Sequence, residues 1–312
     1  MNRLLILAQD ATAYTPLVEA AGLGQLEIVA ATRQGKALAL VADCNIILGE
    51  PPLIAAVLAS ANRLEWVQSS WAGVDRLCRE ELRRDYVLTG VKDIFGGLIS
   101  EYVMTYLFAL ERRIFTMRTN QLQKRWQPRP YRLAKDITVG IIGLGSIGRH
   151  VARTARGFGI RVTGLNRSGR PCDGVEEVYS TENLSQFLAE PDYLVLTLPD
   201  TPQTRHFINA DVLAMMKSSV VLINVGRGSV INETDLVTAL QQGRIGAAVL
   251  DVFETEPLPE DSPLWHLPNV YVTPHFAAAS FPQDVVNIFV ENYHRFSQQE
   301  SLLHQIDFER GY

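Results

Sequence analysis

The chain has 312 residues, of which 47% are hydrophobic and 20% are charged, and its formal net charge at pH 7 is −5. This length exceeds what a single hydrophobic core usually supports, so we expect about two domains. The composition is typical of a soluble globular protein, and the negative charge argues against a dedicated nucleic-acid-binding protein. A basic stretch, residues 112–135, includes Trp126, and we interpret it as a solvated or subunit-facing helix followed by a loop.

The three cysteines, Cys44, Cys78 and Cys172, lie far apart without the spacing of a metal site. An odd number of cysteines without a spacing pattern predicts reduced thiols in a reducing compartment and no metal centre. The apolar run Leu4–Leu7 is too short for a signal-peptide core, and no apolar stretch is long enough to span a bilayer. The sequence therefore predicts a cytoplasmic protein that binds neither membranes nor nucleic acids.

Short apolar runs alternate with helical patterns in the first third of the chain, which predicts an α/β architecture. Continuous apolar runs of this kind are typical of parallel strands that are buried on both faces. The predicted strands are Leu4–Leu7, Leu26–Ala30, Ile46–Leu48, Trp66–Gln68 and Tyr86–Thr89. The helices predicted between them include Thr15–Ala21 and Pro52–Ala59.

A long helix is predicted from Ser100 to Gln123, with Ser100 as its N-cap and Glu101 in its first turn. Its apolar stripe faces either its own domain or another subunit, and consists of Tyr102, Tyr106, Leu110 and Ile114. The proline-containing segment Trp126–Arg132 that follows is expected to be a connector.

A second α/β region begins at Asp136. Its predicted strands are Ile137–Ile142, Arg161–Leu165, Tyr193–Leu198, Val220–Val225, Ala247–Leu250 and Val270–Thr273. Strands in this number within one continuous region predict a doubly wound dinucleotide-binding domain. The amphipathic segment Pro282–Gln298 is expected to form a helix that crosses back onto the first domain.

The first of these strands runs directly into Gly143-Leu144-Gly145-Ser146-Ile147-Gly148, and a helical pattern follows. Gly143 allows a tight turn, Gly145 lets the backbone approach a pyrophosphate, and Gly148 permits close packing of helix on strand. The helix N-terminus, with Ser146 and Ile147, offers free N–H groups to the anion. This context predicts a cofactor phosphate site; the alternative is a glycine-rich turn that binds no ligand.

The end of the next strand is where an NAD-binding protein carries an acidic residue that binds the ribose 2′-OH. Here the sequence is Asn166-Arg167-Ser168, followed by Arg170, without a carboxylate. Arg167 and Arg170 are suited to pair with a 2′-phosphate, and Ser168 to hydrogen-bond it. The segment therefore predicts NADPH in preference to NADH, with NADH still possible; the alternative is a pair of solvated loop arginines.

Three later segments, together with the glycine turn, resemble the D-isomer-specific 2-hydroxyacid dehydrogenase family over essentially the whole chain. They are Asn224-Val225-Gly226-Arg227-Gly228, Leu250-Asp251-Val252-Phe253-Glu254-Thr255-Glu256-Pro257-Leu258-Pro259 and Thr273-Pro274-His275. The Asn166–Arg170 segment, the length and the ending Arg310-Gly311-Tyr312 resemble the NADPH-using glyoxylate/hydroxypyruvate reductase branch.

The resemblance implies a catalytic set of Arg227, Glu256 and His275. Arg227 would hold the substrate's carboxylate and carbonyl, since a guanidinium forks across planar oxygen pairs. His275 would be the acid–base group, because the oxygen of a carbonyl that accepts hydride needs a proton donor with a near-neutral pKa. Glu256 would orient His275, and Glu254 competes for this role. Arg227 alternatively forms a salt bridge with a neighbour, although the glycines on both sides suggest a backbone held close to a ligand.

The resemblance also implies further contacts to the cofactor and the substrate. Asp251 would contact the nicotinamide carboxamide, and the cofactor would also be lined by Leu198, Pro199, Thr204, Val225 and Gly226. The substrate carboxylate would meet the backbone N–H groups of the loop formed by Trp71, Ala72, Gly73 and Val74. Trp71 departs from the family pattern, in which a small residue often stands. It either narrows the substrate end of the site or packs against a neighbouring helix.

We therefore expect two doubly wound parallel-sheet α/β domains, Rossmann-like and flavodoxin-like, with a cleft between them. A substrate domain would comprise residues 1–98 and 283–312, and an NAD(P)-binding Rossmann domain would comprise residues 99–282. The resemblance implies a homodimer through the long helix and NADPH-dependent reduction of glyoxylate to glycolate and hydroxypyruvate to D-glycerate. One alternative is an NAD-linked D-2-hydroxyacid or phosphoglycerate-type dehydrogenase, which the lack of a carboxylate at the ribose position disfavours. Another is a cofactor-sensing scaffold or corepressor, which the intact set of Arg227, Glu256 and His275 disfavours.

Overall fold

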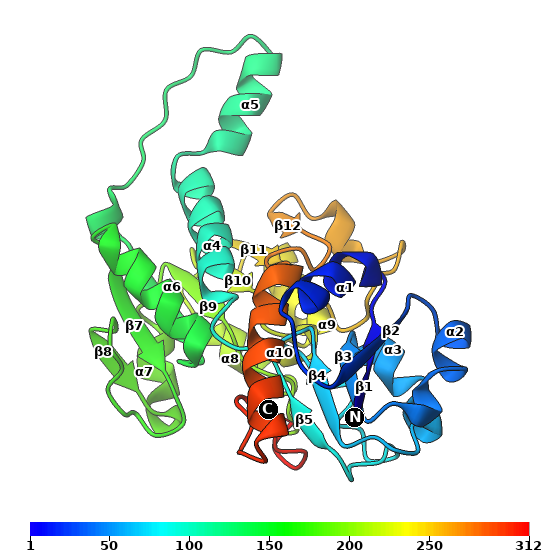
Figure 1. Cartoon of the computed structure of the whole chain (residues 1–312). Helices are drawn as coiled ribbons and strands as arrows, with labels where there is room; N and C mark the ends of the chain where they lie inside the picture. The colour runs from blue at the N-terminus through cyan, green and yellow to red at the C-terminus, as the bar shows by residue number, and fades with distance from the viewer. Residues whose placement is uncertain (312) are drawn as a thin grey trace. The chain divides into compact units, whose positions relative to one another are not determined.

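The computed structural model describes residues 1–311, which form two compact units (Figure 1). One unit combines Met1–Ile94 with the C-terminal residues from Ser280, and the other is Phe95–Ala279. The boundaries predicted from the sequence, after residues 98 and 282, lie within four residues of these. Tyr312, part of the C-terminal tripeptide considered above, lies outside the described residues.

The first unit is built on a parallel sheet with the strand order β2-β1-β3-β4-β5. Its strands are β1 (Asn2–Leu7), β2 (Leu26–Ala31), β3 (Ile46–Gly49), β4 (Trp66–Ser69) and β5 (Val87–Thr89). Its helices are α1 (Ala11–Ala20), α2 (Gln34–Leu38), α3 (Pro51–Ala55) and α10 (Pro282–Ser297), with short 3₁₀ helices η1 (Val41–Asp43) and η2 (Leu58–Ser60). The strand order is that of a flavodoxin-like doubly wound sheet.

Helix α10 completes the first unit from the far end of the chain. The ring of Phe289 stacks on that of Trp66 with centroids 5.1 Å apart. The Asn292 side chain donates to Gln68 Oε1 at 3.1 Å, and the Tyr293 hydroxyl donates to the carbonyl of Gly24 at 2.8 Å. Figure 1 shows α10 in red beside the blue α1, and the two helices are in contact. The buried aromatic contact therefore explains why this segment belongs to the first unit.

The second unit contains a parallel sheet with the strand order β12-β11-β10-β9-β6-β7-β8. Its strands are β6 (Thr138–Ile142), β7 (Arg161–Leu165), β8 (Glu177–Tyr179), β9 (Tyr193–Leu196), β10 (Val221–Asn224), β11 (Ala247–Leu250) and β12 (Val270–Val272). The chain order reverses between β6 and β9, which is the switch point where such sheets bind ligands. The predicted fold class is confirmed, and β8, a strand of three residues, is the one strand of the described residues that was not predicted.

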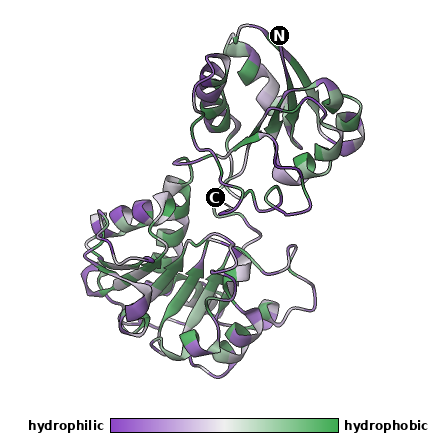
Figure 2. Cartoon of the chain, turned by 90° about the horizontal axis from the view of Figure 1, so that it is seen from below, coloured by the Kyte–Doolittle hydropathy of each residue, from purple (hydrophilic) through white to green (hydrophobic). Residues whose placement is uncertain are grey.

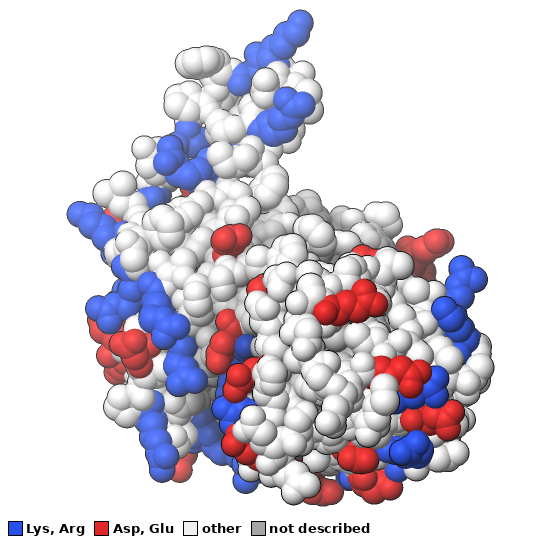
Figure 3. Space-filling model, in the orientation of Figure 1, with Lys and Arg blue, Asp and Glu red and all other residues white. Residues whose placement is uncertain are grey.

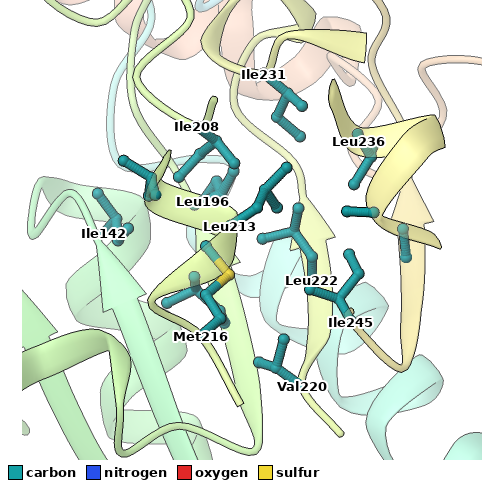
Figure 4. Close-up of a cluster of buried hydrophobic side chains, with 14 of the residues drawn as sticks. Ile142, Leu196, Ile208, Leu213, Met216, Val220, Leu222, Ile231, Leu236 and Ile245 are labelled. Atoms are coloured by element: carbon teal, nitrogen blue, oxygen red, sulfur yellow. The ribbon is translucent and has the colours of Figure 1, made fainter. Parts of the chain in front are cut away.

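The helices of the second unit cover its sheet and bury an aliphatic core. They are α4 (Gly96–Glu111), α5 (Ile114–Leu122), α6 (Ser146–Gly157), α7 (Leu184–Leu188), α8 (Ala210–Ala214) and α9 (Glu233–Gln241), with η3 (Ala134–Asp136), η4 (Thr181–Asn183), η5 (Gly228–Val230) and η6 (Pro263–His266). Leu196 and Leu222 of the sheet pack with Leu213 and Leu236 of the covering helices (Figure 4). Figure 2 shows hydrophobic residues gathered on the strands of each unit and hydrophilic residues on the outward-facing helices.

Three predicted helices differ from the observed ones. The predicted Thr15–Ala21 is α1 at Ala11–Ala20, and the predicted Pro52–Ala59 is divided into α3 and η2. The predicted Ser100–Gln123 is divided into α4 and α5, because Arg113 adopts a left-handed conformation with φ of 53°.

Ser100 is not an N-cap, because α4 begins one turn earlier at Gly96. A Cβ at Gly96 would lie 2.8 Å from His150, so the glycine permits close packing of α4 on α6. The Ser100 hydroxyl lies inside the helix and is buried, 2.7 Å from the Gly96 carbonyl and 2.7 Å from His150 Nδ1. This tertiary contact, which local capping signals do not report, sets the start of the helix.

Residues 114–133 form an arm that extends away from the seven-stranded sheet (Figure 1). The predicted apolar stripe is divided at this arm. Tyr106 packs on Tyr271 of its own unit with ring centroids 6.1 Å apart, whereas Ile114 is 54% exposed. Lys and Arg side chains lie over the arm in Figure 3, as expected from the basic sequence. Within residues 1–311, no helix combines the length and the hydropathy needed to cross a membrane.

Candidate active site

The glycine turn joins β6 to α6 at the switch point of the seven-stranded sheet. Gly143 has a φ of 98°, a conformation that side-chain-bearing residues rarely adopt. A Cβ at Gly148 would lie 2.0 Å from the Gly143 carbonyl oxygen, so only glycine allows the helix to approach the turn. Gly145 is the N-cap of α6 and no side chain caps the helix, which leaves the N–H groups of its first turn available to an anion.

Thr197, which the sequence analysis did not select, shapes the same turn. Its hydroxyl donates to the Gly143 carbonyl at 2.6 Å and lies 3.3 Å from that of Ile142. Thr197 follows β9, the neighbour of β6, so the two strand ends are tied together. The sequence places Thr197 inside the predicted strand Tyr193–Leu198, whereas β9 ends at Leu196 and leaves Thr197 at the strand end. The turn is thus held by a cross-strand hydrogen bond as well as by its glycines.

The candidate 2′-phosphate site follows β7 and is folded into a compact turn. Asn166 Oδ1 accepts the Ser168 N–H at 3.1 Å, and Asn166 Nδ2 donates to the Arg170 carbonyl at 2.9 Å. Arg167 and Arg170 are exposed, and neither forms an ion pair within the described chain. The turn therefore presents two guanidinium groups to solvent at the end of β7, the strand next to β6.

The loop after β9 carries the candidate cofactor contacts Leu198, Pro199 and Thr204. The Thr204 hydroxyl donates to the Pro199 carbonyl at 2.6 Å and accepts the Thr201 N–H at 2.9 Å, which closes the loop. Leu198 borders the glycine turn, since its side chain would lie 3.2 Å from a Cβ at Gly143. These residues therefore line the same strand-end edge as the phosphate turn.

Arg227 lies in a turn that directly follows β10. The buried Asn224 shapes this turn by accepting the Gly226 N–H at 3.1 Å and donating to the Arg227 carbonyl at 3.0 Å. Val225, also buried, donates its N–H to the Leu196 carbonyl at 3.2 Å. The turn is thereby fixed to the adjacent β9.

The glycines on both sides of Arg227 lie against neighbouring backbone. A Cβ at Gly228 would lie 1.9 Å from the backbone carbon of Phe253, and one at Gly226 would lie 2.6 Å from the Leu198 carbonyl oxygen. Both glycines therefore allow neighbouring strand ends to approach each other. Their effect is to hold Arg227 between the loops after β9 and β11.

His275 and Glu256 form a hydrogen-bonded pair near the end of β12. Nδ1 of His275 lies 2.9 Å from Glu256 Oε2, and the other carboxylate oxygen accepts the Phe253 N–H at 3.0 Å. An ionised carboxylate only accepts hydrogen bonds, so Nδ1 carries a proton and Nε2 is left to exchange one. The His275 side chain is 53% exposed, which leaves room for a substrate at Nε2.

The electrostatics of the pair favour an imidazolium beside a carboxylate. The hydrogen bond to Glu256 raises the pKa of His275 above its usual value; burial and Arg227 oppose this rise, whereas the charges of Glu256 and Asp251 add to it. Burial works to raise the pKa of Glu256, but the hydrogen bonds from His275 and the Phe253 amide outweigh it, and the pKa is lowered. Both shifts agree in direction with an ion pair.

Glu254, the competing carboxylate, has a different partner. It pairs with His206 Nε2 at 3.1 Å and accepts the Glu233 N–H at 3.1 Å, while the Glu254 N–H donates to Glu233 at 2.7 Å. The chain thus carries two neighbouring histidine–glutamate pairs. His275 lies close to the end of β12, whereas His206 lies farther along the loop after β9.

Asp251 is buried at the end of β11 and contacts the loop that carries His275. Its carboxylate accepts the Thr273 hydroxyl at 2.6 Å, the Phe276 N–H at 2.7 Å and the Ala277 N–H at 3.0 Å. Thr273 was absent from the sequence-based site, because its hydrogen bond joins two strand ends. Asp251 therefore fixes the backbone around His275.

The candidate substrate loop, Trp71–Val74, lies in the first unit after β4. The Trp71 carbonyl accepts the Ser69 hydroxyl at 2.8 Å, and the Trp71 N–H donates back to it at 3.1 Å. Trp71 is 40% exposed, whereas Val74 is buried and anchors the loop in the core of its unit. Ala72 is exposed and Gly73 half-buried.

Comparison with known proteins supplies independent information on the whole chain. The NAD-binding domain of D-isomer-specific 2-hydroxyacid dehydrogenases matches residues 104–277. A glyoxylate/hydroxypyruvate reductase A from Serratia proteamaculans is 35% identical over 243 residues, which cover 76% of this chain and 78% of that protein.

Solved structures extend the similarity to both units. A D-isomer-specific 2-hydroxyacid dehydrogenase family protein from Aeromonas salmonicida is 47% identical, with a TM-score of 0.95 over 98% of this chain and 99% of that one. An NADPH-dependent glyoxylate/hydroxypyruvate reductase from Sinorhizobium meliloti, crystallised with NADP and sulfate, is 31% identical, with a TM-score of 0.88 over 100% of both chains.

The resemblance inferred from the glycine turn and the three strand-end motifs is thus confirmed by the domain match and by relatives that span most of the sequence. The chain belongs to the D-isomer-specific 2-hydroxyacid dehydrogenases, which are NAD(P)-dependent oxidoreductases.

Proposed function

We propose that this protein reduces small 2-oxo acids with NADPH, converting glyoxylate to glycolate and hydroxypyruvate to D-glycerate. The observation that carries the proposal is the His275–Glu256 pair, with a raised His275 pKa, at the strand-end edge that also bears the glycine turn. The similarity to reductases named for glyoxylate and hydroxypyruvate supports this substrate class. The three free cysteines support a cytoplasmic setting for the reaction.

The turn of Gly143–Gly148 would hold the cofactor diphosphate, because Gly145 leaves open space beside the uncapped first turn of α6, whose N–H groups an anion can approach. Arg167, Ser168 and Arg170 would hold the 2′-phosphate of NADPH. The nicotinamide, when bound, supplies the hydride. Asp251 keeps acceptor capacity on Oδ2, which takes a single hydrogen bond in the structure, and would receive the carboxamide N–H.

In the proposed reaction the carbonyl carbon of the 2-oxo acid gains a hydride and the carbonyl oxygen gains a proton. His275 donates that proton from Nε2, and Glu256 keeps the Nδ1 proton in place. Arg227 holds the substrate carboxylate through its guanidinium group. Developing negative charge on the oxygen is thus met by a preformed donor.

Replacing His275 tests its role as the proton donor. His275→Asn suits the left-handed φ of 51° at this position, since asparagine tolerates that conformation. With NADPH and glyoxylate we expect kcat to fall by about 10²–10⁴-fold, while the Kd for NADPH, measured by fluorescence titration, stays within about two-fold. His206→Asn is the matched control, because His206 has the same φ of 51° and its own glutamate partner. Equal loss in both variants, or turnover retained in His275→Asn, contradicts the assignment.

The pH dependence of the reaction follows from the raised His275 pKa. Reduction requires the imidazolium, which is present below this pKa, so kcat/KM falls as pH rises through it. Glu256→Gln keeps a hydrogen-bond acceptor but removes the charge that stabilises the imidazolium. We expect the alkaline limb of its profile to move to lower pH by about one unit or more. A wild-type profile that is flat up to pH 9, or an unmoved limb in Glu256→Gln, argues against the mechanism.

The cofactor preference depends on the exposed guanidinium groups after β7. We expect the wild type to have a higher kcat/KM with NADPH than with NADH. In the double variant Arg167→Gln/Arg170→Gln, kcat/KM with NADPH should fall by about 10-fold or more, because two charge-assisted hydrogen bonds are removed. Activity with NADH should change little. Arg244→Gln is the control, since this exposed arginine precedes β11 at the opposite edge of the sheet. An equal or higher kcat/KM of the wild type with NADH identifies an NAD-linked dehydrogenase instead.

We propose a homodimer formed through the arm. Exposed apolar side chains are frequent there and include Ile114, Phe115, Leu122, Trp126, Tyr131 and Leu133. Analytical ultracentrifugation should give twice the chain mass of 34.7 kDa. Leu122→Glu/Trp126→Glu should shift the protein to the monomer. Met215→Glu, which alters the exposed apolar C-cap residue of α8 outside the arm, should leave the dimer intact. A wild-type monomer refutes the proposal.

A further inference from the structure

The backbone of His275 has a conformation that residues with a side chain rarely adopt. Its φ is 51°, in the left-handed region that residues with a side chain adopt only when their surroundings impose it. The residues before and after it belong to a loop without regular structure. The direction of the imidazole therefore depends on whatever holds this loop.

Asp251 holds the loop on both sides of His275. Its backbone carbonyl accepts the His275 N–H at 2.8 Å. Its carboxylate accepts the Thr273 hydroxyl at 2.6 Å and the N–H groups of Phe276 at 2.7 Å and Ala277 at 3.0 Å. Asp251 is only 2% exposed, so these bonds lie out of competition with water. Hydrogen bonds to Asp251 thus hold the left-handed turn on both sides of His275.

A tyrosine from α4 extends this network. The Tyr102 and Thr273 hydroxyl oxygens lie 2.7 Å apart. Thr273 directs its single hydroxyl hydrogen to the Asp251 carboxylate, which only accepts, so Thr273 must accept the hydrogen of Tyr102. Burial raises the pKa of Tyr102 well above its usual value, and Tyr102 therefore remains a donor across the working pH range.

The Tyr102 ring is itself held in place. It packs against Tyr106 with ring centroids 4.9 Å apart, and Tyr106 packs against Tyr271 of β12 at 6.1 Å. These ring contacts on α4 therefore hold the Tyr102 hydroxyl within hydrogen-bonding distance of Thr273. Four groups, from Tyr102 through Thr273 and Asp251 to the His275 backbone, form one chain of hydrogen bonds.

We propose that Tyr102 is a positioning residue for the reaction: through Thr273 and Asp251, its hydroxyl fixes the left-handed turn that aims His275 at the substrate. The proposal rests on the proposed function, in which His275 is the proton donor. Removing the Tyr102 hydroxyl leaves Thr273 Oγ1 without its donor and free to rotate away from Asp251. The His275 turn then loses one of its fixed contacts, and its alignment with Glu256 loosens.

Single hydroxyl deletions test this network. For Tyr102→Phe and Thr273→Val, which keep ring and branched shape, we expect kcat with NADPH and glyoxylate to fall by roughly 10-fold, because small displacements of reacting groups cost rate steeply. Thr273→Ser restores the hydroxyl and should recover most of the activity. The melting temperatures of all three variants should stay above the assay temperature, so that each kcat is measured on folded protein.

The pH profile separates positioning from a general structural effect. The charged groups that face His275 are Glu256, Arg227 and Asp251. If the turn loosens, His275 loses contact with Glu256, and the alkaline limb of kcat/KM moves to lower pH in Tyr102→Phe and Thr273→Val. Tyr271→Phe is the matched control, because Tyr271 lies in the same aromatic cluster but its hydroxyl makes no hydrogen bond within residues 1–311. It should retain the wild-type rate and profile.

Each result decides the proposal. Wild-type kcat and pH profile in Tyr102→Phe, with His275→Asn inactive, overturn the role of Tyr102 but leave the proposed function intact. A fall in activity with an unmoved alkaline limb, or an equal fall in Tyr271→Phe, makes Tyr102 a structural residue and also overturns it. Turnover retained in His275→Asn instead rejects the proposed function itself, whatever Tyr102→Phe shows.

Discussion

The candidate active site depends on the parallel register of five neighbouring strands in the second unit. Ile142, Leu196, Asn224, Leu250 and Val272 are the last residues of β6, β9, β10, β11 and β12, and each is paired with its neighbour in one row across the sheet. The residue that follows each of these strands therefore lies at the same edge of the sheet, where the carboxyl ends of the strands meet. That edge carries the glycine turn, Thr197, the Arg227 turn, Asp251 and Thr273, although these lie far apart in sequence.

This register also explains why glycine is needed at two of the strand ends. Neighbouring strands run about 4.8 Å apart, so loops that leave the same edge crowd one another. Gly228 approaches Phe253 and Gly148 approaches Gly143 at distances that no Cβ would permit. Any larger residue there would push two loops apart and move Arg227 or the helix α6. These positions are thus constrained by packing within the protein, although they lie beside the candidate active site.

The sequence predicted the strands well and the helix boundaries poorly. Strands buried on both faces are continuous apolar runs, a local signal that their neighbours do not alter. The start of α4 at Gly96 depends instead on packing against His150, and its break depends on the left-handed Arg113. Neither can be read from capping residues alone.

The same distinction applies to the candidate site. The motifs pointed to Arg227, Glu256 and His275 and left Glu254 as a rival, because two glutamates two positions apart look alike in a sequence. The structure pairs one with His275 and the other with His206. Thr197 was not selected and Tyr102 was assigned only to an apolar stripe, since their hydrogen bonds reach partners 54 and 171 residues away along the chain. Such partners are set by topology.

Helix α10 has a consequence for the order in which the chain acquires its structure during synthesis. The second unit is continuous in sequence, so all its strands leave the ribosome before α10 is made. The first strands of the first unit emerge earlier, but Trp66 and Gln68 lack Phe289 and Asn292 until α10 has been synthesised. The unit made first is therefore finished last, and its exposed aromatic surface is the part of the nascent chain most open to chaperones and to aggregation.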